Sequence, residues 1–496
     1  MSNYLSKSRV LSFRQCPKRL WLEVHRGGRE VLGADAELAF IQGNEVGEQA
    51  RRHFGGGTLV SSQDNLSGAL AETTAALKVK PAIPIYEATF AHAGLLVRVD
   101  ALVPDGARHR LVEVKSAASV KAYQVEDIAI QRWVLERLGI QTSASTLMHV
   151  DSDFVYQGDG DYQGLLVEED RTGEAAALDS AVSDWVAVAR RTLEGAEPEV
   201  AMGEQCSSPF ACPFQSYCER QGGTPEYPVT LLPNRKGKIV SRQLIAAGLH
   251  DLREVPEERL AEYPDLARIQ RATATGEPYL DPQAGDELAR LPYPRAWLDF
   301  ESIGFVVPRW PGTKPYQQVP FQWSCYIEAT PGHYELAEFL DLSGDDPRRH
   351  CAQALASALT GVQCVIAYNA SYEKTRLLEL AALFPDLAPK LSRAAGITWD
   401  LLSLVRRSYY HRDMRGSWSI KAVLPAVLKT DPYADLPGVR SGGAAQLAYY
   451  QATQHRATPE RKAELADGLR AYCRVDVWAM IAVASALRGQ PPPNLD

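Results

Sequence analysis

The sequence predicts an α/β protein made of several domains. Its 496 residues exceed what a single hydrophobic core usually contains, so two or three domains are expected. Segments that alternate apolar and polar residues, as strands do, recur between segments with helical spacing. A polar, proline-punctuated stretch over 223–292 separates two such regions and predicts a small helical connector between domains over 1–222 and 293–496.

The composition is that of a soluble globular protein, with 45% hydrophobic and 23% charged residues. Neither a signal-peptide-like apolar run at the start nor a stretch long enough to span a membrane is present, so we expect a cytoplasmic protein without a membrane partner. A net charge of -8 argues against a protein coated in basic surface. It does not exclude nucleic-acid binding, because phosphate contacts depend on local patches.

Three basic segments are candidate contacts to nucleic acid, at residues 16–29, 234–238 and 406–415. In the third segment, Tyr409 and Tyr410 lie among arginines, an arrangement that suits base stacking beside a phosphate backbone. The alternative for each segment is an ordinary solvated loop. The connector stretch "LIAAGLHDLREVP" resembles a helix-hairpin-helix that grips a DNA backbone, and its alternative is a plain connector.

The first candidate site lies in "GLLVRVDALVPDGARHRLVEVKSAA", residues 94–118, which predicts two strands joined by a turn. Asp100 ends the first strand, and Glu113 and Lys115 share one face of the second. A helix follows with Asp127 and Gln131 one turn apart. Carboxylates at Asp100 and Glu113 can bind Mg²⁺ or Mn²⁺, while a lysine can orient an attacking water. The alternative is the charge alternation of an exposed strand.

This arrangement resembles the PD-(D/E)xK nucleases of the RecB-like type. The resemblance implies a restriction-endonuclease-like domain whose active site contains Asp100, Glu113 and Lys115, with the helix of Gln131 in support. Asp100 and Glu113 would be the metal ligands.

Two positions depart from that family. Leu135 stands where many members have a tyrosine four residues after the glutamine. Where many members have a metal-binding histidine in the first helix, the segment around Gly47 offers Glu45 or Glu48 instead. Either glutamate can replace the histidine as a ligand, or both are exposed helix residues.

Four of the eight cysteines form the second candidate site. Cys206, Cys212 and Cys218 are spaced C-x5-C-x5-C, and Cys16 is the expected fourth ligand. One distant N-terminal cysteine with three after the nuclease core resembles the [4Fe–4S] nucleases of the AddB type and their CRISPR-associated relatives, which implies a structural iron–sulfur cluster. The spacing differs from their commoner C-x2-C-x5-C, so zinc or unligated thiols remain alternatives.

The last candidate site begins in "AWLDFESIGF", residues 296–305, which predicts a strand. Asp299 and Glu301 are two residues apart, so their carboxylates point to the same face. Two like charges beside each other in an apolar strand repel, and a divalent cation makes such a pair favourable.

Further segments in the same order resemble the DEDD exonucleases of the ribonuclease H-like (DnaQ) superfamily. "VIAYNASYEKTRLLEL" supplies Glu373, and "YCRVDVWAM" places Tyr472 four residues before Asp476. The resemblance implies that Asp299, Glu301, Glu373 and Asp476 hold two cations, and that Tyr472 holds the attacking water. Glu373 departs from the aspartate of that family, and Asp400 is either an additional acid or a structural residue.

The whole chain therefore resembles a fused family of unknown function, with an iron–sulfur PD-(D/E)xK nuclease ahead of a ribonuclease H-like exonuclease. We expect a metal-dependent hydrolase of phosphodiester bonds, acting on single-stranded or free-ended DNA rather than RNA, in repair, recombination or defence. A helicase or another repair or defence protein is the expected kind of protein partner. The alternative is a nucleic-acid-binding or scaffolding subunit whose exonuclease-like domain is inactive, which the glutamate at position 373 favours.

Overall fold

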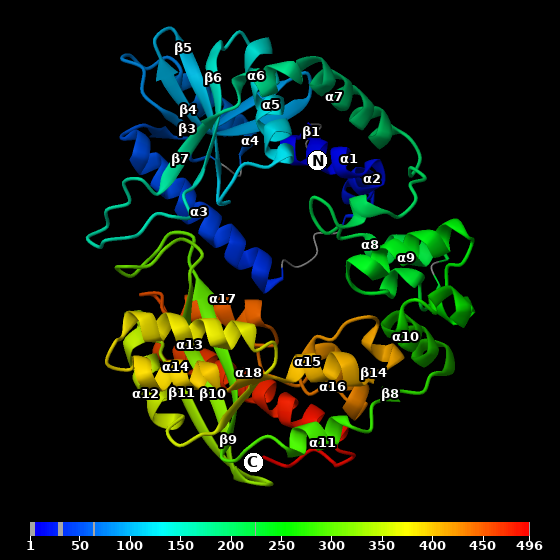
Figure 1. The fold of residues 1–496 in the computed structure, drawn as a ribbon. Coiled ribbons are helices and arrows are strands. Elements are labelled where there is room, and N and C mark those ends of the chain that lie inside the picture. The colour runs from blue at the N-terminus through cyan, green and yellow to red at the C-terminus, as the bar shows by residue number, and fades with distance from the viewer. Residues whose placement is uncertain (1–4, 28–32, 63–64, 224, 496) are drawn as a thin grey trace. The chain divides into compact units, whose positions relative to one another are not determined.

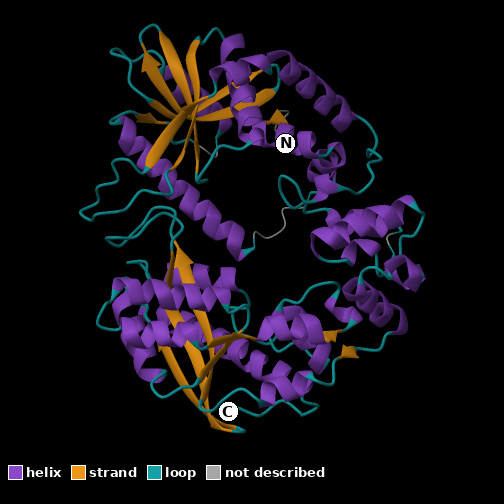
Figure 2. Ribbon diagram, viewed as in Figure 1, coloured by secondary structure: helices purple, strands orange, loops and turns teal. Residues whose placement is uncertain are grey.

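The computed structural model describes residues 5–27, 33–62, 65–223 and 225–495 (Figure 1). Helices and strands alternate along the chain, which confirms the predicted α/β class with more than one domain (Figure 2). The chain divides into two compact units. Unit 1 comprises Met1–Gly223 with Phe305–Gln317, and unit 2 comprises Thr224–Gly304 with Gln318–Asp496.

These units differ in two respects from the predicted domains 1–222, 223–292 and 293–496. The connector does not form a compact unit of its own but belongs to unit 2. Residues 305–317, which follow the strand of Asp299, belong to unit 1 although the sequence pattern assigns them to the C-terminal domain. Membership of a compact unit depends on long-range packing, which local patterns do not reveal.

Unit 1 is built around one mixed sheet. Its elements are, in chain order, β1 (Leu5–Ser6), α1 (Lys7–Gln15), α2 (Pro17–His25), α3 (Ala34–Phe54), β2 (Thr58–Leu59), α4 (Leu66–Ala76), β3 (Ile85–His92), β4 (Leu95–Asp105), β5 (Arg108–Lys115), α5 (Ala122–Arg137), β6 (Thr142–Val150), β7 (Leu166–Asp170), α6 (Thr172–Ala177), α7 (Asp179–Glu194), the 3₁₀ helix η1 (Glu204–Cys206) and α8 (Gln215–Gln221). The strand order is β2-β3-β4-β5-β6-β7, and β1 pairs in parallel with β4.

The two faces of this sheet pack into separate apolar cores, as β5 illustrates. Successive side chains in a strand point to opposite faces. Leu111 joins the core shared with α1, α4, α5 and α7, whereas Val112 joins the core shared with α3 and the 305–317 segment. Glu113 therefore lies on the same face as Leu111, toward α5.

Unit 2 combines the connector with a second sheet. Its elements are η2 (Val229–Leu231), α9 (Asn234–Ala246), η3 (Leu252–Glu254), η4 (Glu257–Leu260), α10 (Pro264–Thr275), β8 (Tyr279–Leu280), α11 (Ala284–Ala289), β9 (Arg295–Gly304), β10 (Gln318–Thr330), β11 (His333–Leu340), α12 (Arg348–Ala358), β12 (Cys364–Ala367), α13 (Ser371–Leu383), α14 (Ala388–Gly396), β13 (Thr398–Asp400), α15 (Leu401–Ser408), β14 (Tyr409–Tyr410), η5 (Arg412–Met414), α16 (Ile420–Leu428), α17 (Gly442–Ala452) and α18 (Pro459–Leu487).

The five-stranded sheet of unit 2 has the order β11-β10-β9-β12-β13. The β9–β10 and β10–β11 pairs are antiparallel, and the β9–β12 and β12–β13 pairs are parallel. Leu298 and Phe300 of β9 belong to the core shared with α12, α13 and α14. Asp299 and Glu301 alternate with them and so face the other side, where α17 and α18 pack (Figure 1).

The connector helices pack within unit 2 against the end of α15 and the segment that follows it. Arg268 of α10 donates hydrogen bonds from its two terminal nitrogens to the main-chain oxygens of Arg407 at 2.6 Å and Arg406 at 3.0 Å. Gly416 has a φ of +76° and lies so close to the carbonyl of Leu231 that a Cβ there would clash. These contacts hold two stretches far apart in sequence against each other.

None of the helices in the described ranges combines the length and the apolar character needed to cross a membrane.

Candidate metal centres

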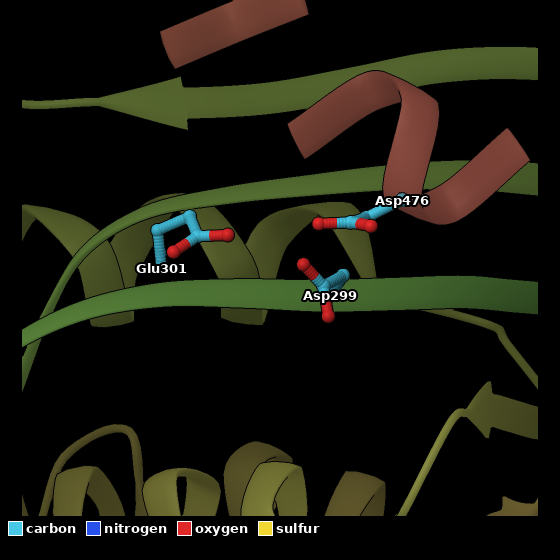
Figure 3. A group of neighbouring side chains, drawn as sticks. All are labelled: Asp299, Glu301 and Asp476. Atoms are coloured by element: carbon cyan, nitrogen blue, oxygen red, sulfur yellow. The ribbon is translucent and has the colours of Figure 1, made fainter. Parts of the chain in front are cut away.

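The C-terminal acid triad consists of Asp299, Glu301 and Asp476 (Figure 3). Two of its members come from β9, and Asp476 comes from α18, which packs on that face of the sheet. Each of the three side chains offers one carboxylate oxygen, and these oxygens all lie within 4.8 Å of one another. Among the described residues, no other three His, Cys, Asp or Glu side chains bring their ligand atoms this close. The structure thus brings together three acids that the sequence analysis placed in one site.

Two members of the triad are buried and Asp299 is partly buried, which makes their charges costly without a cation. Glu301 is 7% exposed and Asp476 is 9% exposed. Burial, together with the neighbouring carboxylates Asp476 and Glu301, raises the pKa of Asp299 well above its usual range. Burial and Asp476 do the same to the pKa of Glu301. Oxygen ligands in such a concentration suit Mg²⁺ or Mn²⁺.

Three further side chains complete the surroundings of the triad. Tyr472, one turn before Asp476 on α18, accepts a hydrogen bond from Lys421 Nζ at 2.9 Å. The hydroxyl of Tyr433 donates a hydrogen bond to Asp476 Oδ1 at 2.5 Å. Burial and the charge of Asp476 raise the pKa of Tyr472 far above that of a free tyrosine, so its hydroxyl stays protonated and acts as a hydrogen-bond donor rather than as a base.

Glu373 lies near the triad without joining it. It lies in the first turn of α13, is 2% exposed, and contributes to the raised pKa of Asp299. Its own pKa is raised to about 8 by burial, and its Oε2 has no hydrogen-bond partner among the described residues. The predicted fourth acid is therefore close enough to interact electrostatically but outside the 4.8 Å group.

Asp400 has a structural part in unit 2. Its Oδ1 accepts hydrogen bonds from the main-chain nitrogens of Asn369 at 3.0 Å and Ala370 at 3.1 Å. Its Oδ2 caps α15 by accepting from the main-chain nitrogen of Ser403 at 3.2 Å. Since both oxygens are engaged in this way, Asp400 fixes the turn that precedes α13 instead of adding a carboxylate to the triad.

The N-terminal acid–lysine cluster combines Asp100, Glu113, Lys115, Asp127 and Gln131 with Lys7. Pairing between β4 and β5 ends at Ala101 and Val112, and Asp100 Oδ2 accepts the main-chain N–H of Val114 at 2.7 Å. Gln131 of α5 donates to Glu113 Oε2 at 2.5 Å. The residues predicted for the first site therefore converge at the point where β4 and β5 separate.

Two lysines neutralise the acids of this cluster. Lys115 Nζ lies 2.6 Å from Glu113 Oε1 and 2.5 Å from Asp127 Oδ2. Lys7 Nζ lies 2.9 Å from Glu113 Oε1 and 2.9 Å from Asp127 Oδ1. Because two cations stand between these carboxylates, the acids here do not form a group within 4.8 Å like the triad of unit 2.

The two predicted metal ligands of the cluster have pKa values that are shifted in opposite directions. Burial, with the negative charge of Glu113, raises the pKa of Asp100 to about 8. Burial alone would also raise the pKa of Glu113, but Lys115 and Lys7 outweigh it and hold that pKa well below its usual range. The pKa values of both lysines lie above their usual range because the acids outweigh burial. Lys115 is thus a cation in this arrangement, suited to bind phosphate or orient water.

Replacement of Lys7 by methionine is expected to destabilise the metal-free protein. The change leaves Glu113 and Asp127 with Lys115 as their remaining cation, and breaking a fully buried pair costs about 3–5 kcal/mol. The Lys7 side chain is 19% exposed, so we expect a loss of about 2 kcal/mol, measured by urea unfolding in EDTA. Lys78→Met, at an exposed position in the same unit, is the matched control. Equal stability of the two variants would contradict a neutralising part for Lys7.

Glu45, Glu48 and Leu135 were also compared with residues of the nuclease family in the sequence analysis. Glu45 forms an ion pair with Arg309 at 2.8 Å, and Glu48 forms one with Arg52 at 2.6 Å. Leu135 is fully buried in the core between α5 and the sheet. The two glutamates therefore have partners outside the cluster, and the position of the family's tyrosine is an apolar core position here.

The four predicted cysteine ligands line one pocket. Cys16 lies between α1 and α2, Cys206 ends η1, and Cys218 is on α8, while Cys212 donates its main-chain N–H to Cys206 at 2.8 Å. Gln15 holds the loop in place by donating to the carbonyl oxygens of Gln205 and Phe210. The other cysteines, at 325, 351, 364 and 473, are buried in unit 2.

The grouping of these four sulfurs can be compared with that around a single zinc ion. Zinc with Zn–S bonds of about 2.3 Å keeps its four sulfurs about 3.8 Å apart. No three of the four described sulfurs lie within 4.8 Å of one another. The four thiols therefore line one pocket without the close grouping of a tetrahedral zinc site.

Sequence reasoning did not identify Lys7, Lys421 or Tyr433 as members of these sites. Lys7 lies 106 residues before Glu113 and has no spacing relation to it. Lys421 lies in "GSWSIKAVL", where no local pattern links it to Tyr472. Tyr433 has no local signal, since its contact with Asp476 depends on how 429–439 folds against α18.

Two comparisons relate the chain to proteins whose descriptions state no activity. Residues 296–419 match a family described as a domain of unknown function, DUF2779. The chain is also 27% identical over 214 residues to a protein of Mycoplasma pneumoniae described as "Uncharacterized protein MG366 homolog". That match covers 39% of this chain and 32% of the relative, so the chain spans about a third of the relative's length. The family match includes Asp299 and Glu301 but ends before Asp476.

Proposed function

We propose that the protein is a metal-dependent nuclease that hydrolyses phosphodiester bonds in DNA through two separate centres. The observation that carries the proposal is the buried triad of Asp299, Glu301 and Asp476, whose oxygens lie within 4.8 Å of one another next to a protonated tyrosine. Buried acids without cations are costly, so such a group favours divalent ions as its normal occupants.

The topology of each unit supports the fold that the motifs imply. In unit 2, an antiparallel β11-β10-β9 arrangement continues into parallel β12 and β13, with helices on both faces, as expected for a ribonuclease H-like domain. In unit 1, the antiparallel β3-β4-β5 arrangement is followed by α5 and a parallel β6, as expected for a PD-(D/E)xK domain. These folds are part of the proposal.

In the centre of unit 2, the triad residues Asp299, Glu301 and Asp476 would hold the metal, with Glu373 available beside them. The bound ions would supply Lewis-acid stabilisation of the phosphodiester and a nucleophilic water at neutral pH. Tyr472 orients that water by donating a hydrogen bond, and Lys421 positions the tyrosine hydroxyl through its 2.9 Å contact. Tyr433 fixes the orientation of the Asp476 carboxylate.

In the centre of unit 1, Asp100 and Glu113 would hold the metal, and Lys115 is the cation that faces the substrate phosphate. Gln131 fixes Glu113, since it donates to the oxygen that the lysines leave free. Binding of a divalent ion would require Lys7 or Lys115 to give up part of its contact with Glu113. In the metal-free protein, the two lysines thus supply the positive charge that a bound metal ion would otherwise supply.

We also propose that Cys16, Cys206, Cys212 and Cys218 hold a [4Fe–4S] cluster of structural function. The cysteines come from the N-terminal helices and from the segment that ends unit 1, so a shared group would join the two ends of that unit. Lys18 and Arg19 lie beside the thiols of Cys218 and Cys212 and favour their thiolate forms, which burial opposes.

Replacement of Cys16 by serine is expected to remove the iron and to lower the thermal stability of the purified protein, because the bound group then no longer joins the two ends of unit 1. The measurements are iron and zinc content, visible absorbance and the unfolding temperature. Ser216→Ala, an exposed position on α8, is the control that leaves the thiols intact. A colourless wild-type protein with stoichiometric zinc would reject the cluster in favour of the alternative ion.

A second candidate function is a nucleic-acid-binding or scaffolding subunit with an inactive exonuclease-like unit 2. One observation favours it: Glu373 lies outside the group of acids within 4.8 Å and keeps an oxygen without a hydrogen-bond partner in the described chain. An inactive unit would show no Mn²⁺-dependent hydrolysis at any metal concentration, whereas a weakened one would respond to Mn²⁺.

Cleavage assays with end-labelled single- and double-stranded DNA and RNA test the proposed function. We expect metal-dependent hydrolysis of DNA, with single strands or free ends preferred, and no hydrolysis in EDTA. Absence of hydrolysis of all four substrates in the presence of Mg²⁺ and Mn²⁺ would reject it.

A further inference from the structure

Unit 2 contains a basic groove formed by stretches far apart in the sequence. The groove consists of two adjoining pockets, of which the first has a volume of about 750 Å³ and is lined by residues of α9, α10, α15 and the segment before α16. A neighbouring pocket of about 340 Å³ shares Asn234, Asp265 and Leu266 with it. Two of the basic segments found in the sequence, 234–238 and 406–415, meet here although they are separated by more than a hundred residues.

The charge of this lining contrasts with that of the whole chain. The cations that line the two pockets are Arg235, Lys236, Arg268, Arg406 and Arg407, and the acid in the same lining is Asp265. The chain as a whole has a net charge of -8. A positive concavity on an acidic protein concentrates its field on an anionic ligand.

Three of the cations are available to a ligand. Arg235, Lys236 and Arg406 are exposed, and none of them forms an ion pair within the described ranges. Arg407 forms an ion pair with Glu287. Arg268 is engaged in the fold, because it donates hydrogen bonds to the carbonyls of residues 406 and 407. The groove therefore has fixed walls and free positive side chains, as a phosphate-binding surface requires.

The groove also offers main-chain donors and an aromatic ring. Ser419 lines it and is the residue before α16, a nine-residue helix whose N-terminus has no side-chain cap. Uncapped N–H groups at a helix N-terminus bind phosphate oxygens. Trp418, half-buried in the same lining, presents a ring on which a base can stack.

A single stretch of chain connects the groove to the acid triad. Ser417, Trp418 and Ser419 line the groove, and Lys421, two residues further on, donates to Tyr472 beside Asp476. On the other side, Tyr368 at the end of β12 donates to the carbonyl of Trp418 at 2.7 Å, five residues before Glu373. A polymer in the groove would thus pass along the segment that carries the triad's lysine.

We propose that this groove binds the phosphate backbone of single-stranded DNA and guides its end to the triad. The delivery of the strand to a hydrolytic site rests on the proposed function, whereas the binding of the strand in the groove does not. A single strand is the fitting occupant because Glu301 and Asp476 are only 7% and 9% exposed, and a narrow free end approaches such side chains more readily than an intact duplex does. Contacts through phosphates make the binding independent of base sequence.

The test compares two triple variants that each remove three positive charges. The groove variant is Arg235→Gln, Lys236→Gln and Arg406→Gln. The control is Lys390→Gln, Arg393→Gln and Arg456→Gln, which changes exposed residues of unit 2 that do not line the groove. Binding of labelled oligothymidylate is measured by fluorescence anisotropy in EDTA over a range of salt concentrations, with oligouridylate and a DNA duplex as further arms.

We expect the groove variant to bind oligothymidylate at least about ten-fold more weakly than the control, with unchanged unfolding temperature. Its plot of log affinity against log salt should be shallower by about 2, since each lost phosphate contact on a single strand removes about 0.7 from the slope. Equal affinity of the two variants, no binding by the wild type, or tighter binding of duplex than of single strands would overturn the inference. Stronger binding of oligouridylate would overturn its assignment to DNA.

Failure of the groove and failure of the proposed function have different signatures. If the wild type cleaves DNA and the groove variant binds and cleaves as the control does, the groove inference fails and the function stands. If the wild type binds single strands through the groove but hydrolyses none of them, the hydrolytic function fails and the groove inference stands.

Discussion

Replacement of Asp299 by asparagine is expected to reduce the Mn²⁺-dependent hydrolysis by unit 2 at least about 1000-fold, equal to about 4 kcal/mol of transition-state stabilisation. The amide keeps the size of the side chain but removes one of three carboxylates within 4.8 Å. The measurement is single-turnover cleavage of end-labelled single-stranded DNA in a background of Lys115→Met, which silences unit 1.

The same variant should be more stable than the wild type without metal. The pKa of Asp299 is raised in the folded protein, so the folded state binds its proton more tightly than the unfolded state does. Its contribution to stability is therefore present at low pH and is lost as the pH rises from about 4 toward the raised pKa. In EDTA, the unfolding temperature of the wild type should fall as the pH rises above about 4, and that of Asp299→Asn should fall less.

The stability readout provides a test that does not depend on activity. Mn²⁺ should raise the unfolding temperature of the wild type and have little effect on Asp299→Asn. If Mn²⁺ stabilises both proteins equally, the triad is not the metal site. If Mn²⁺ stabilises the wild type but produces no hydrolysis, the inactive-subunit alternative for unit 2 is supported.

Replacement of Lys115 by methionine is expected to reduce hydrolysis by unit 1 at least about 100-fold, the usual contribution of a group that positions or activates the attacking water. Methionine fills much of the same space but leaves Glu113 and Asp127 with Lys7 as their nearby cation. Cleavage of double- and single-stranded DNA is measured in the Asp299→Asn background, so that unit 2 does not contribute.

Lys78→Met in the same background is the control for this prediction, because it removes an exposed lysine from unit 1. Glu113→Gln should behave as Lys115→Met does, since it removes a predicted metal ligand and the lysine's partner together. Hydrolysis at the wild-type rate by the double variant Lys115→Met with Asp299→Asn would exclude both centres as the source of activity.

Local spacing predicted which acids share a face in each candidate centre, and the family resemblances predicted which distant acids join them. In β5, the alternation of Glu113 and Lys115 with valine placed their side chains on one face, and the structure shows them bound to α5 and α1 on that face. On α18, the spacing of four residues put Tyr472 above Asp476. Such short-range relations are fixed by the geometry of strands and helices.

The sequence by itself predicted the α/β class, and the family resemblances of its motifs predicted the acids of the two candidate centres and the four cysteines that share a pocket. Periodicity and spacing account for the pairs of side chains that share a face. The tertiary structure decided that Lys7 neutralises Glu113, that Lys421 and Tyr433 complete the triad's surroundings, that Glu373 lies outside it, and that two basic segments form one groove. It also decided that residues 305–317 belong to unit 1. These relations arise from packing between segments distant in the chain, and no local period records which distant segments will meet.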